Sequence, residues 1–237
     1  MLCKIADLLV DVPEAGGMAP RCRDYLWQGK IAEPIITIQE QQYEPEYWSG
    51  ISYDQMCYLE SGHVFDHYLV RYNGLRLHAS AFSWGGRAYL FSADSGTGKS
   101  THRKMWQALY GEDNVVVFND DKPSLRLMDG KWYAYGTPWC GREGINKNAK
   151  VPLAGICFLE QGPENHIRRL KPTEILPYFM NQTVWRMDNR EDMEMLMASL
   201  DKLFQNIPIY LMQCTPTTDA AKLSSETMLQ GAIDAGL

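Results

Sequence analysis

The sequence lacks the features that mark membrane, secreted and nucleic-acid-binding proteins. No apolar run approaches the length of a membrane span, and no signal-like apolar stretch follows Met1. The six cysteines lie far apart without a C-x-x-C pair, so we expect reduced thiols and a cytoplasmic protein. A net charge of −6 disfavours nucleic acid and anionic membranes as partners, because both select clustered Lys and Arg.

Internal repeats, low-complexity tracts and a linker-like change of composition are also missing. The 237 residues, 45% of them hydrophobic, suffice for one large core. We therefore expect a single domain over residues 1–237. It comprises an N-terminal extension (1–74) of unassigned role, a nucleotide-binding core (75–170) and a helical C-terminal part (171–237). Self-association into a homo-oligomer stays open.

Hydrophobic periodicity predicts strands in the middle of the chain and helices towards its end. This pattern is not a strict alternation of strand and helix, so we expect a mixed α/β fold with a strand-rich centre. The expected strands are Glu33–Gln41, Leu75–Phe82, Ala88–Ala93, Val115–Asp121, Gly155–Gln161, His166–Leu170 and Ile207–Cys214, with a hairpin over Ser124–Gly136. The expected helices are Ser52–Gly74, with Gly62 as a candidate break into two helices, and Thr101–Gly111, Pro172–Gln182, Asp192–Phe204 and Thr218–Met228.

A glycine-rich segment, FSADSGTGKS (residues 91–100), follows a predicted strand and opens a predicted helix. Its ending resembles the phosphate-binding pattern G-x-x-x-x-G-K-[ST], in which backbone N–H groups surround an anion. Lys99 is then placed to reach the β- and γ-phosphates, and the Ser100 hydroxyl to ligate Mg²⁺. The expected nucleotide-binding residues are Ser95, Gly96, Thr97, Gly98, Lys99, Ser100 and Thr101.

Ala93 departs from the pattern, because it stands where the first glycine is usual. Alanine can take that place if its φ is negative. The alternative interpretation is a surface turn whose serine caps a helix.

Two carboxylates, Asp120 and Asp121, end the strand that follows the phosphate-loop helix. Side chains alternate along a strand, so the two acids can take separate roles, one near a metal and one as proton acceptor. The sequence N-D-D-K-P is also typical of a plain turn. His78, on the preceding predicted strand, could assist proton transfer or orient one of the acids, although a lone strand histidine is usually structural. GTPWCG (residues 136–141) is either a rigid loop that shapes a pocket or a turn beneath a core tryptophan.

Taken in order, Leu77-His78-Ala79, the loop DSGTGKS and Asp120-Asp121 resemble the catalytic domain of HPr kinase/phosphorylase, of the phosphoenolpyruvate-carboxykinase-like P-loop superfold. The resemblance covers roughly residues 75–170. It implies an ATP- and Mg²⁺-dependent serine-type kinase with Asp120 as acid/base, Lys99 on the phosphates and His78 as partner of the acids. It also implies metal binding by Ser100 and Asp121.

Several positions depart from the family pattern. Ala93 and Ala79 replace glycines, and the E-x-R-G segment has only Arg142 and Glu143 in CGREG as a counterpart. The phosphate acceptor therefore stays open between a peptide, a protein and a small-molecule hydroxyl compound. Two other functions also remain, a non-catalytic ATP-binding regulatory module and an ATP-dependent carboxykinase-like enzyme.

Overall fold

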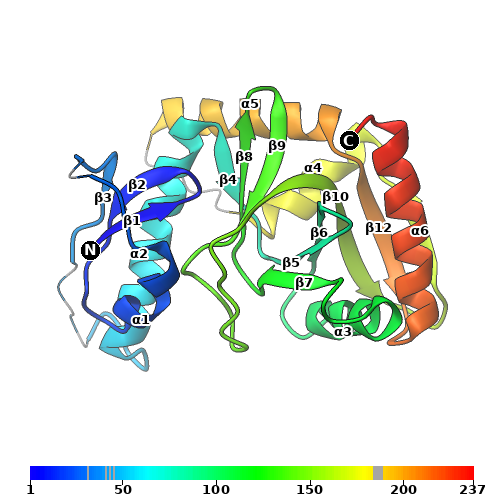
Figure 1. The fold of residues 1–237 in the computed structure, drawn as a ribbon, viewed down its shortest axis with the longest axis horizontal. Coiled ribbons are helices and arrows are strands. Elements are labelled where there is room, and N and C mark those ends of the chain that lie inside the picture. Colours follow the sequence, from blue (N-terminus) through cyan, green and yellow to red (C-terminus); the bar gives the residue numbers. More distant parts are fainter. Residues whose placement is uncertain (31, 41, 43, 45, 184–188) are drawn as a thin grey trace.

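The computed structural model describes residues 1–30, 32–40, 42, 44, 46–183 and 189–237, whose strands form two sheets (Figure 1). The small sheet contains β1 (Leu2–Ile5), β2 (Leu8–Asp11) and β3 (Ile36–Thr37). The main path of the large sheet has the order β4-β8-β9-β10-β6-β5-β7, and β12 pairs with both β10 and β11. Its strands are β4 (Gly74–Arg76), β5 (Ala79–Trp84), β6 (Arg87–Ser92), β7 (Val116–Asn119), β8 (Ser124–Met128), β9 (Lys131–Tyr135), β10 (Lys150–Gln161), β11 (His166–Arg169) and β12 (Ile209–Cys214).

The long strand β10 joins the two halves of the large sheet. Its beginning pairs antiparallel with β9, and the remainder pairs parallel with β6 and β12. At Cys157 the neighbours are Phe91 of β6 and Tyr210 of β12. The carboxyl ends of three parallel strands therefore meet at one edge, which is where ligands bind in many sheets of this kind.

Helices cover both faces of this sheet because its strands alternate apolar side chains between two cores. On β6, Ala88 and Leu90 enter one core and Tyr89 and Phe91 the other. The first core includes residues of α4 (Pro172–Met180) and α5 (Arg190–Asn206). The second includes residues of α3 (Lys99–Tyr110) and α6 (Thr218–Asp234). The predicted mixed α/β fold is confirmed.

The N-terminal third packs against the large sheet through a third core. Apart from the small sheet, it contains α1 (Met18–Cys22), α2 (Tyr53–Leu69) and the 3-10 helices Arg23–Tyr25 and Val70–Tyr72. Phe65 and Leu69 of α2 share this core with residues of β1 and β2 and with Tyr135 and Trp139, which follow later in the chain. Figure 1 shows the small sheet and α2 on the left. Residues far apart in sequence thus meet in this core.

Two local predictions need correction. Helix α2 runs through Gly62 without a break, and a Cβ there would lie 3.0 Å from Trp139 Cδ1, so glycine permits close packing. A capping box between Ser52 and Gln55 begins this helix. The strand predicted from Glu33 is reduced to β3, and its predicted end, Gln41, lies outside the described residues.

The β1–β2 hairpin was not predicted. Its turn residues, Ala6 and Asp7, have φ of 48° and 62°, which a sequence usually signals with Gly or Asn. The Ser124–Gly136 hairpin is confirmed, with Asp129 and Gly130 at positive φ in the turn.

Candidate active site

The glycine-rich loop lies between β6 and α3, as predicted. Gly96 and Gly98 have φ of 84° and 121°, values that favour glycine, and α3 begins directly at Lys99. The Lys99 ammonium donates to the Ala93 carbonyl at 2.7 Å, which holds the side chain along the loop. Burial lowers the pKa of Lys99, and the carboxylates of Asp121 and Asp94 oppose this shift.

Ala93 fits the loop without backbone strain. It is not among the four non-glycine residues with positive φ in the described parts of the chain. Its side chain is buried and belongs to the core shared by α3 and α6. The replaced glycine is therefore no obstacle to a phosphate-binding loop.

The two acids lie immediately after β7, on a turn fixed by Asn119. The Asn119 side-chain oxygen accepts from the backbone N–H groups of Asp121 and Lys122, at 3.0 and 2.7 Å. This is the turn that N-D-D-K-P predicts, and it also directs both carboxylates to the cavity at the phosphate loop. The turn interpretation is confirmed, and the roles of the two acids stay a prediction.

Asp120 is buried and held by backbone N–H groups of the loop that follows β9. Gly141 N donates to Oδ1 at 2.7 Å and Glu143 N to Oδ2 at 3.1 Å. A Cβ at Gly141 would lie 3.0 Å from Asp120 Oδ2, so glycine permits this approach. Burial raises the pKa of Asp120 despite these hydrogen bonds.

Asp121 belongs to a hydrogen-bonded chain that returns to the phosphate loop. Its Oδ1 lies 3.1 Å from His78 Nε2, and His78 Nδ1 lies 2.8 Å from Gln182 Oε1. Gln182 Nε2 in turn donates to Asp94 Oδ1 at 2.8 Å. Burial pushes the pKa of Asp121 upward, but the hydrogen bond and charge of His78, with Lys122 and Lys99, outweigh it and lower the pKa.

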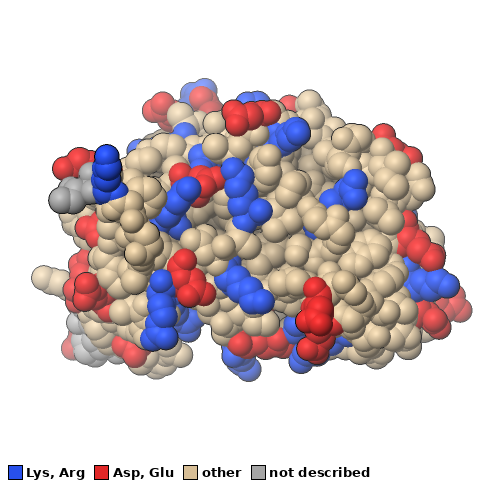
Figure 2. Space-filling view, viewed as in Figure 1, with Lys and Arg blue, Asp and Glu red and all other residues tan. Residues whose placement is uncertain are grey.

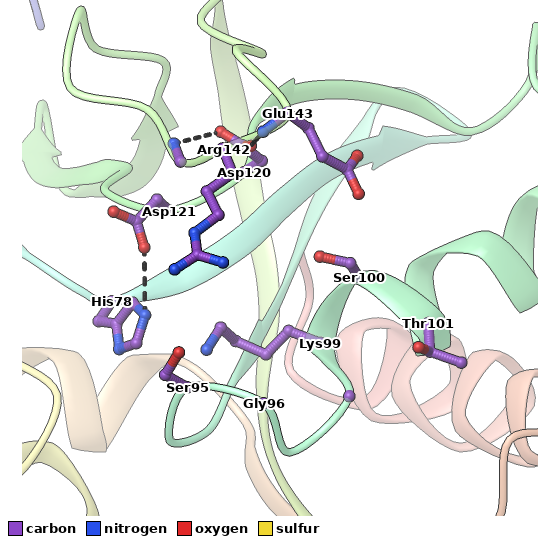
Figure 3. A pocket seen from close by; sticks show the side chains of 12 residues that line it. His78, Ser95, Gly96, Lys99, Ser100, Thr101, Asp120, Asp121, Arg142 and Glu143 are labelled. Atoms are coloured by element: carbon purple, nitrogen blue, oxygen red, sulfur yellow. Dashed lines mark hydrogen bonds and ion pairs between the residues drawn. The ribbon is translucent and has the colours of Figure 1, made fainter.

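His78 occupies a different position from the one predicted. It lies between β4 and β5 rather than within a strand, because its N–H donates to the Gln182 carbonyl at 2.7 Å. Its own carbonyl accepts from Ser92 Oγ at 2.8 Å. These bonds hold the backbone of His78. The imidazole itself lies between Gln182 Oε1 and Asp121 Oδ1 and faces Asp121 (Figure 3).

The glycine-rich loop, the two acids and His78 line one cavity of about 500 Å³. Figure 3 shows Lys99 and Ser100 on one side of it, Asp121 and His78 on another, and the Arg142 guanidinium pointing between them. Thr97 alone among the predicted nucleotide-binding residues is not in its wall and lines a neighbouring cavity instead. The wall comprises His78, Ser95, Gly96, Gly98, Lys99, Ser100, Thr101, Asp120, Asp121, Gly141, Arg142 and Glu143.

The loop 141–144 is attached to the phosphate-loop helix as well as to Asp120. Glu143 forms ion pairs with Arg103 at 2.5 Å and Lys104 at 3.3 Å, both on α3. Trp139, just before this loop, is buried and stacks on Phe65 with ring centroids 4.9 Å apart. GTPWCG is therefore both a turn over a core tryptophan and a support for the cavity wall.

Sequence reasoning missed Gln182, because a lone glutamine near a helix end carries no motif. Arg142 and Glu143 could be found only as an imperfect E-x-R-G counterpart. The basic stretches Lys147–Lys150 and Arg168-Arg169 do not line the cavity. On the face shown in Figure 2, Lys and Arg are interspersed with Asp and Glu.

The six cysteines are free, as expected. None of the helices in the described ranges is long and apolar enough to cross a bilayer.

Comparison with known proteins identifies a family. Residues 55–219 match the family described as "SynChlorMet cassette protein ScmC", a span that includes the phosphate loop and both acids. The chain belongs to the ScmC family. No curated protein matches the sequence. Among solved structures, the HPr(Ser) kinase/phosphatase from Coxiella burnetii is similar at 12% identity, with a TM-score of 0.36, over 65% of this chain and 88% of that chain. At this level of similarity, the function of the ScmC chain is best argued from its own site.

Proposed function

We propose that this ScmC protein is an ATP- and Mg²⁺-dependent kinase of the HPr-kinase-like type that transfers the γ-phosphate to a hydroxyl group. The observation that carries the proposal is the shared cavity, whose wall joins the Gly-Lys-Ser loop to two strand-end carboxylates and a histidine. Phosphoryl transfer depends mainly on positioning and electrostatic stabilisation, and these groups supply both.

The loop and its neighbouring cavity suggest how the nucleotide would lie. A cavity of about 410 Å³ shares Gly96, Gly98 and Thr101 with the acidic cavity but extends to Gln161 and Cys214. We place the nucleoside there and the γ-phosphate next to Lys99. The helix dipole and the backbone N–H groups at the start of α3 favour the phosphate charge.

The acceptor hydroxyl then approaches from the side of the acids. Its oxygen forms a bond to the γ-phosphorus while the bond to the bridging β–γ oxygen breaks and ADP leaves. Asp120, fixed by two backbone N–H groups, takes the hydroxyl proton. Asp121, aligned by His78, stays ionised, and Lys99 holds the phosphate charge.

The oxygen donors at the site fit Mg²⁺. Ser100 and Asp121 would hold it, and it would supply positive charge to the phosphate oxygens. In the described ranges, no group of three or more His, Cys, Asp or Glu side chains is arranged to hold a metal. The donor set of Ser100 and Asp121 suits Mg²⁺, which proteins commonly bind through one or two carboxylates plus substrate phosphates.

The first test is Asp120→Asn. We expect ATP affinity, measured by calorimetry with Mg²⁺, to stay within about threefold, because the phosphate loop is intact. Transfer of label from γ-labelled ATP to acceptors in a cell extract should fall by about 10²- to 10⁴-fold, the usual contribution of a general base. The exposed residue Asp113 gives the matched control, Asp113→Asn.

Three outcomes would contradict the proposal at different points. Unchanged transfer by Asp120→Asn would remove Asp120 from the base role. Absence of ATP binding by the wild-type protein would overturn the kinase function. ATP binding without transfer to any acceptor would favour a regulatory module instead.

A further inference from the structure

A second cavity, of about 430 Å³, adjoins the acidic one on the side away from the phosphate loop. The two cavities share Asp121, Gly141 and Arg142. A molecule in the second cavity would therefore reach Asp121 and the transferred phosphate from the side opposite to the nucleotide. In-line transfer requires this arrangement of attacking and leaving oxygens.

The N-terminal third builds most of the wall of this cavity. Ile51, Tyr58 and Leu59 give it an apolar side, and Leu59 is 41% exposed. The Tyr58 hydroxyl donates to the Cys140 carbonyl at 3.0 Å, which joins α2 to the loop carrying Gly141. Burial and the nearby carboxylate of Asp121 raise the pKa of Tyr58, so this hydroxyl stays protonated.

Two guanidinium groups give the cavity its positive charge. Arg21 donates from Nη1 to Cys140 Sγ at 3.0 Å, and its Cζ lies 4.7 Å from the centroid of the Tyr58 ring. No ion pair joins Arg21 or Arg142 to any residue in the described ranges. The shared carboxylate, Asp121, is already paired with His78. Both arginines therefore retain N–H donors suited to carboxylate or phosphate oxygens.

We propose that this cavity is the acceptor site of the kinase, and that it takes an alcohol that also carries a carboxylate and an apolar group. The inference rests on the proposed kinase function. Arg142, which borders both cavities, would face the transferred phosphate, and Arg21 would bind the acceptor carboxylate. The apolar group would lie on Leu59 and Ile51, and the hydroxyl would point to Asp121 and Asp120.

This assignment gives the N-terminal third a function. Free hydroxy amino acids and peptides that end in serine both provide a hydroxyl and a carboxylate at short separation. The two sources differ in the apolar group, which a peptide can supply through the preceding residue. The test therefore includes both.

The experiment compares matched acceptors with labelled ATP and Mg²⁺. The probes are L-serine, N-acetyl-leucyl-serine and the C-terminal amide of the same dipeptide, which lacks the carboxylate. We expect kcat/KM for the acid to exceed that for the amide by about 10- to 100-fold, the range of one charge-assisted hydrogen-bonded pair. Preference for the dipeptide over serine supports the apolar part of the site, and a preference for serine contradicts it.

Variants in the wall of the second cavity test which residues cause the preference for a carboxylate and for an apolar group. Arg21→Gln should abolish the preference for the acid over the amide and leave the affinity for ATP unchanged. Leu59→Gln, at an exposed position, should raise KM for the dipeptide about threefold or more and leave KM for serine unchanged. Arg23→Gln is the matched control, because Arg23 is exposed and lines neither cavity.

The outcomes separate this inference from the proposed function. If the wild-type protein binds ATP but accepts acid and amide equally, the acceptor-site assignment is wrong. The same holds if it phosphorylates none of the probes, or if Arg21→Gln keeps the preference. If the wild-type protein neither binds nor hydrolyses ATP, the kinase function itself fails.

Discussion

At the scale of single residues, the site depends on how each acid is held. Asp120 accepts two backbone N–H groups, and Asp121 is joined through His78 and Gln182 to Asp94 of the phosphate loop. Gln182 is buried and has no place in any sequence motif. Its two side-chain hydrogen bonds nevertheless fix the imidazole that orients Asp121, so we treat it as a positioning residue.

Gln182→Ala tests this role. The imidazole of His78 would lose its contact with Gln182 Oε1, which lies 2.8 Å from Nδ1. Asp121 would then lose its fixed orientation. We expect kcat to fall about 10- to 100-fold, because small displacements of reacting groups cost this much. KM for ATP should change less than about twofold, since the proposed function has the loop bind the phosphates through backbone N–H groups that this variant leaves in place.

The neighbouring exposed residue Asn181 supplies the control, Asn181→Ala. Steady-state kinetics and urea unfolding of both variants separate positioning from folding. An equal loss of kcat in the control, or a loss of ATP affinity as large as that of kcat, would show a merely structural role for Gln182.

At the scale of elements, α3 connects the phosphate loop to the core. Its His102 ring lies 4.5 Å from that of Phe91, and Nε2 lies 2.9 Å from Ser224 Oγ of α6. Burial lowers the pKa of His102 from 6.5 to about 4. The folded state therefore favours neutral imidazole, whereas the unfolded chain takes up the proton at its ordinary pKa.

The sign of the pH effect follows from this depressed pKa. The contribution of His102 to stability is fully present above pH 6.5 and is lost as the pH falls through about 4. The difference between a pKa of 6.5 and one of about 4 corresponds to about 3 kcal/mol in the free energy of unfolding. We expect His102→Gln to remove this part of the pH dependence of the free energy of unfolding between pH 7 and 4.

Urea unfolding at several pH values measures the effect. The exposed residue His166 provides the matched variant, His166→Gln, which should retain the pH dependence of the wild-type protein. Parallel curves for His102→Gln and the wild type would contradict the assignment of acid sensitivity to this ring.

At the scale of the whole molecule, Trp139 joins the N-terminal third to the large sheet. It is 2% exposed, stacks on Phe65 of α2 and donates from Nε1 to Ser61 Oγ at 3.1 Å. The next two residues, Cys140 and Gly141, line the proposed acceptor cavity. Packing between the two parts of the chain and the geometry of the site are therefore coupled.

Trp139→Ala should lower the free energy of unfolding by about 3–5 kcal/mol, the usual cost of removing a buried aromatic side chain. Because the third core spans both parts of the chain, we expect a single cooperative transition to shift in urea unfolding. Tyr47→Ala is the control, since Tyr47 is 77% exposed. Two separate transitions in the wild-type protein, or a loss below about 1 kcal/mol, would show that the N-terminal third is independent of the core.

Local patterns determined a large part of this structure. The alternation over Ser124–Gly136 with Asp-Gly at its turn predicts the β8–β9 hairpin, and the strand–loop–helix order around FSADSGTGKS predicts the β6–α3 unit. Hydrophobic period and turn chemistry are short-range properties, so they can be read along the chain. The position of the two acids at the end of β7 follows from the same rules.

Only the tertiary structure decided which distant groups meet. Gln182 reaches His78 across 104 residues, and Tyr58 reaches Cys140 across 82. Gly62, which suggested a helix break, instead lets α2 approach Trp139. No local pattern carries such contacts, because they depend on strand order and on how helices pack over the sheet. The sequence by itself thus determined a glycine-rich loop between a strand and a helix, and two acids at the end of β7, whereas the packing of the N-terminal third beside Asp121 created the second cavity.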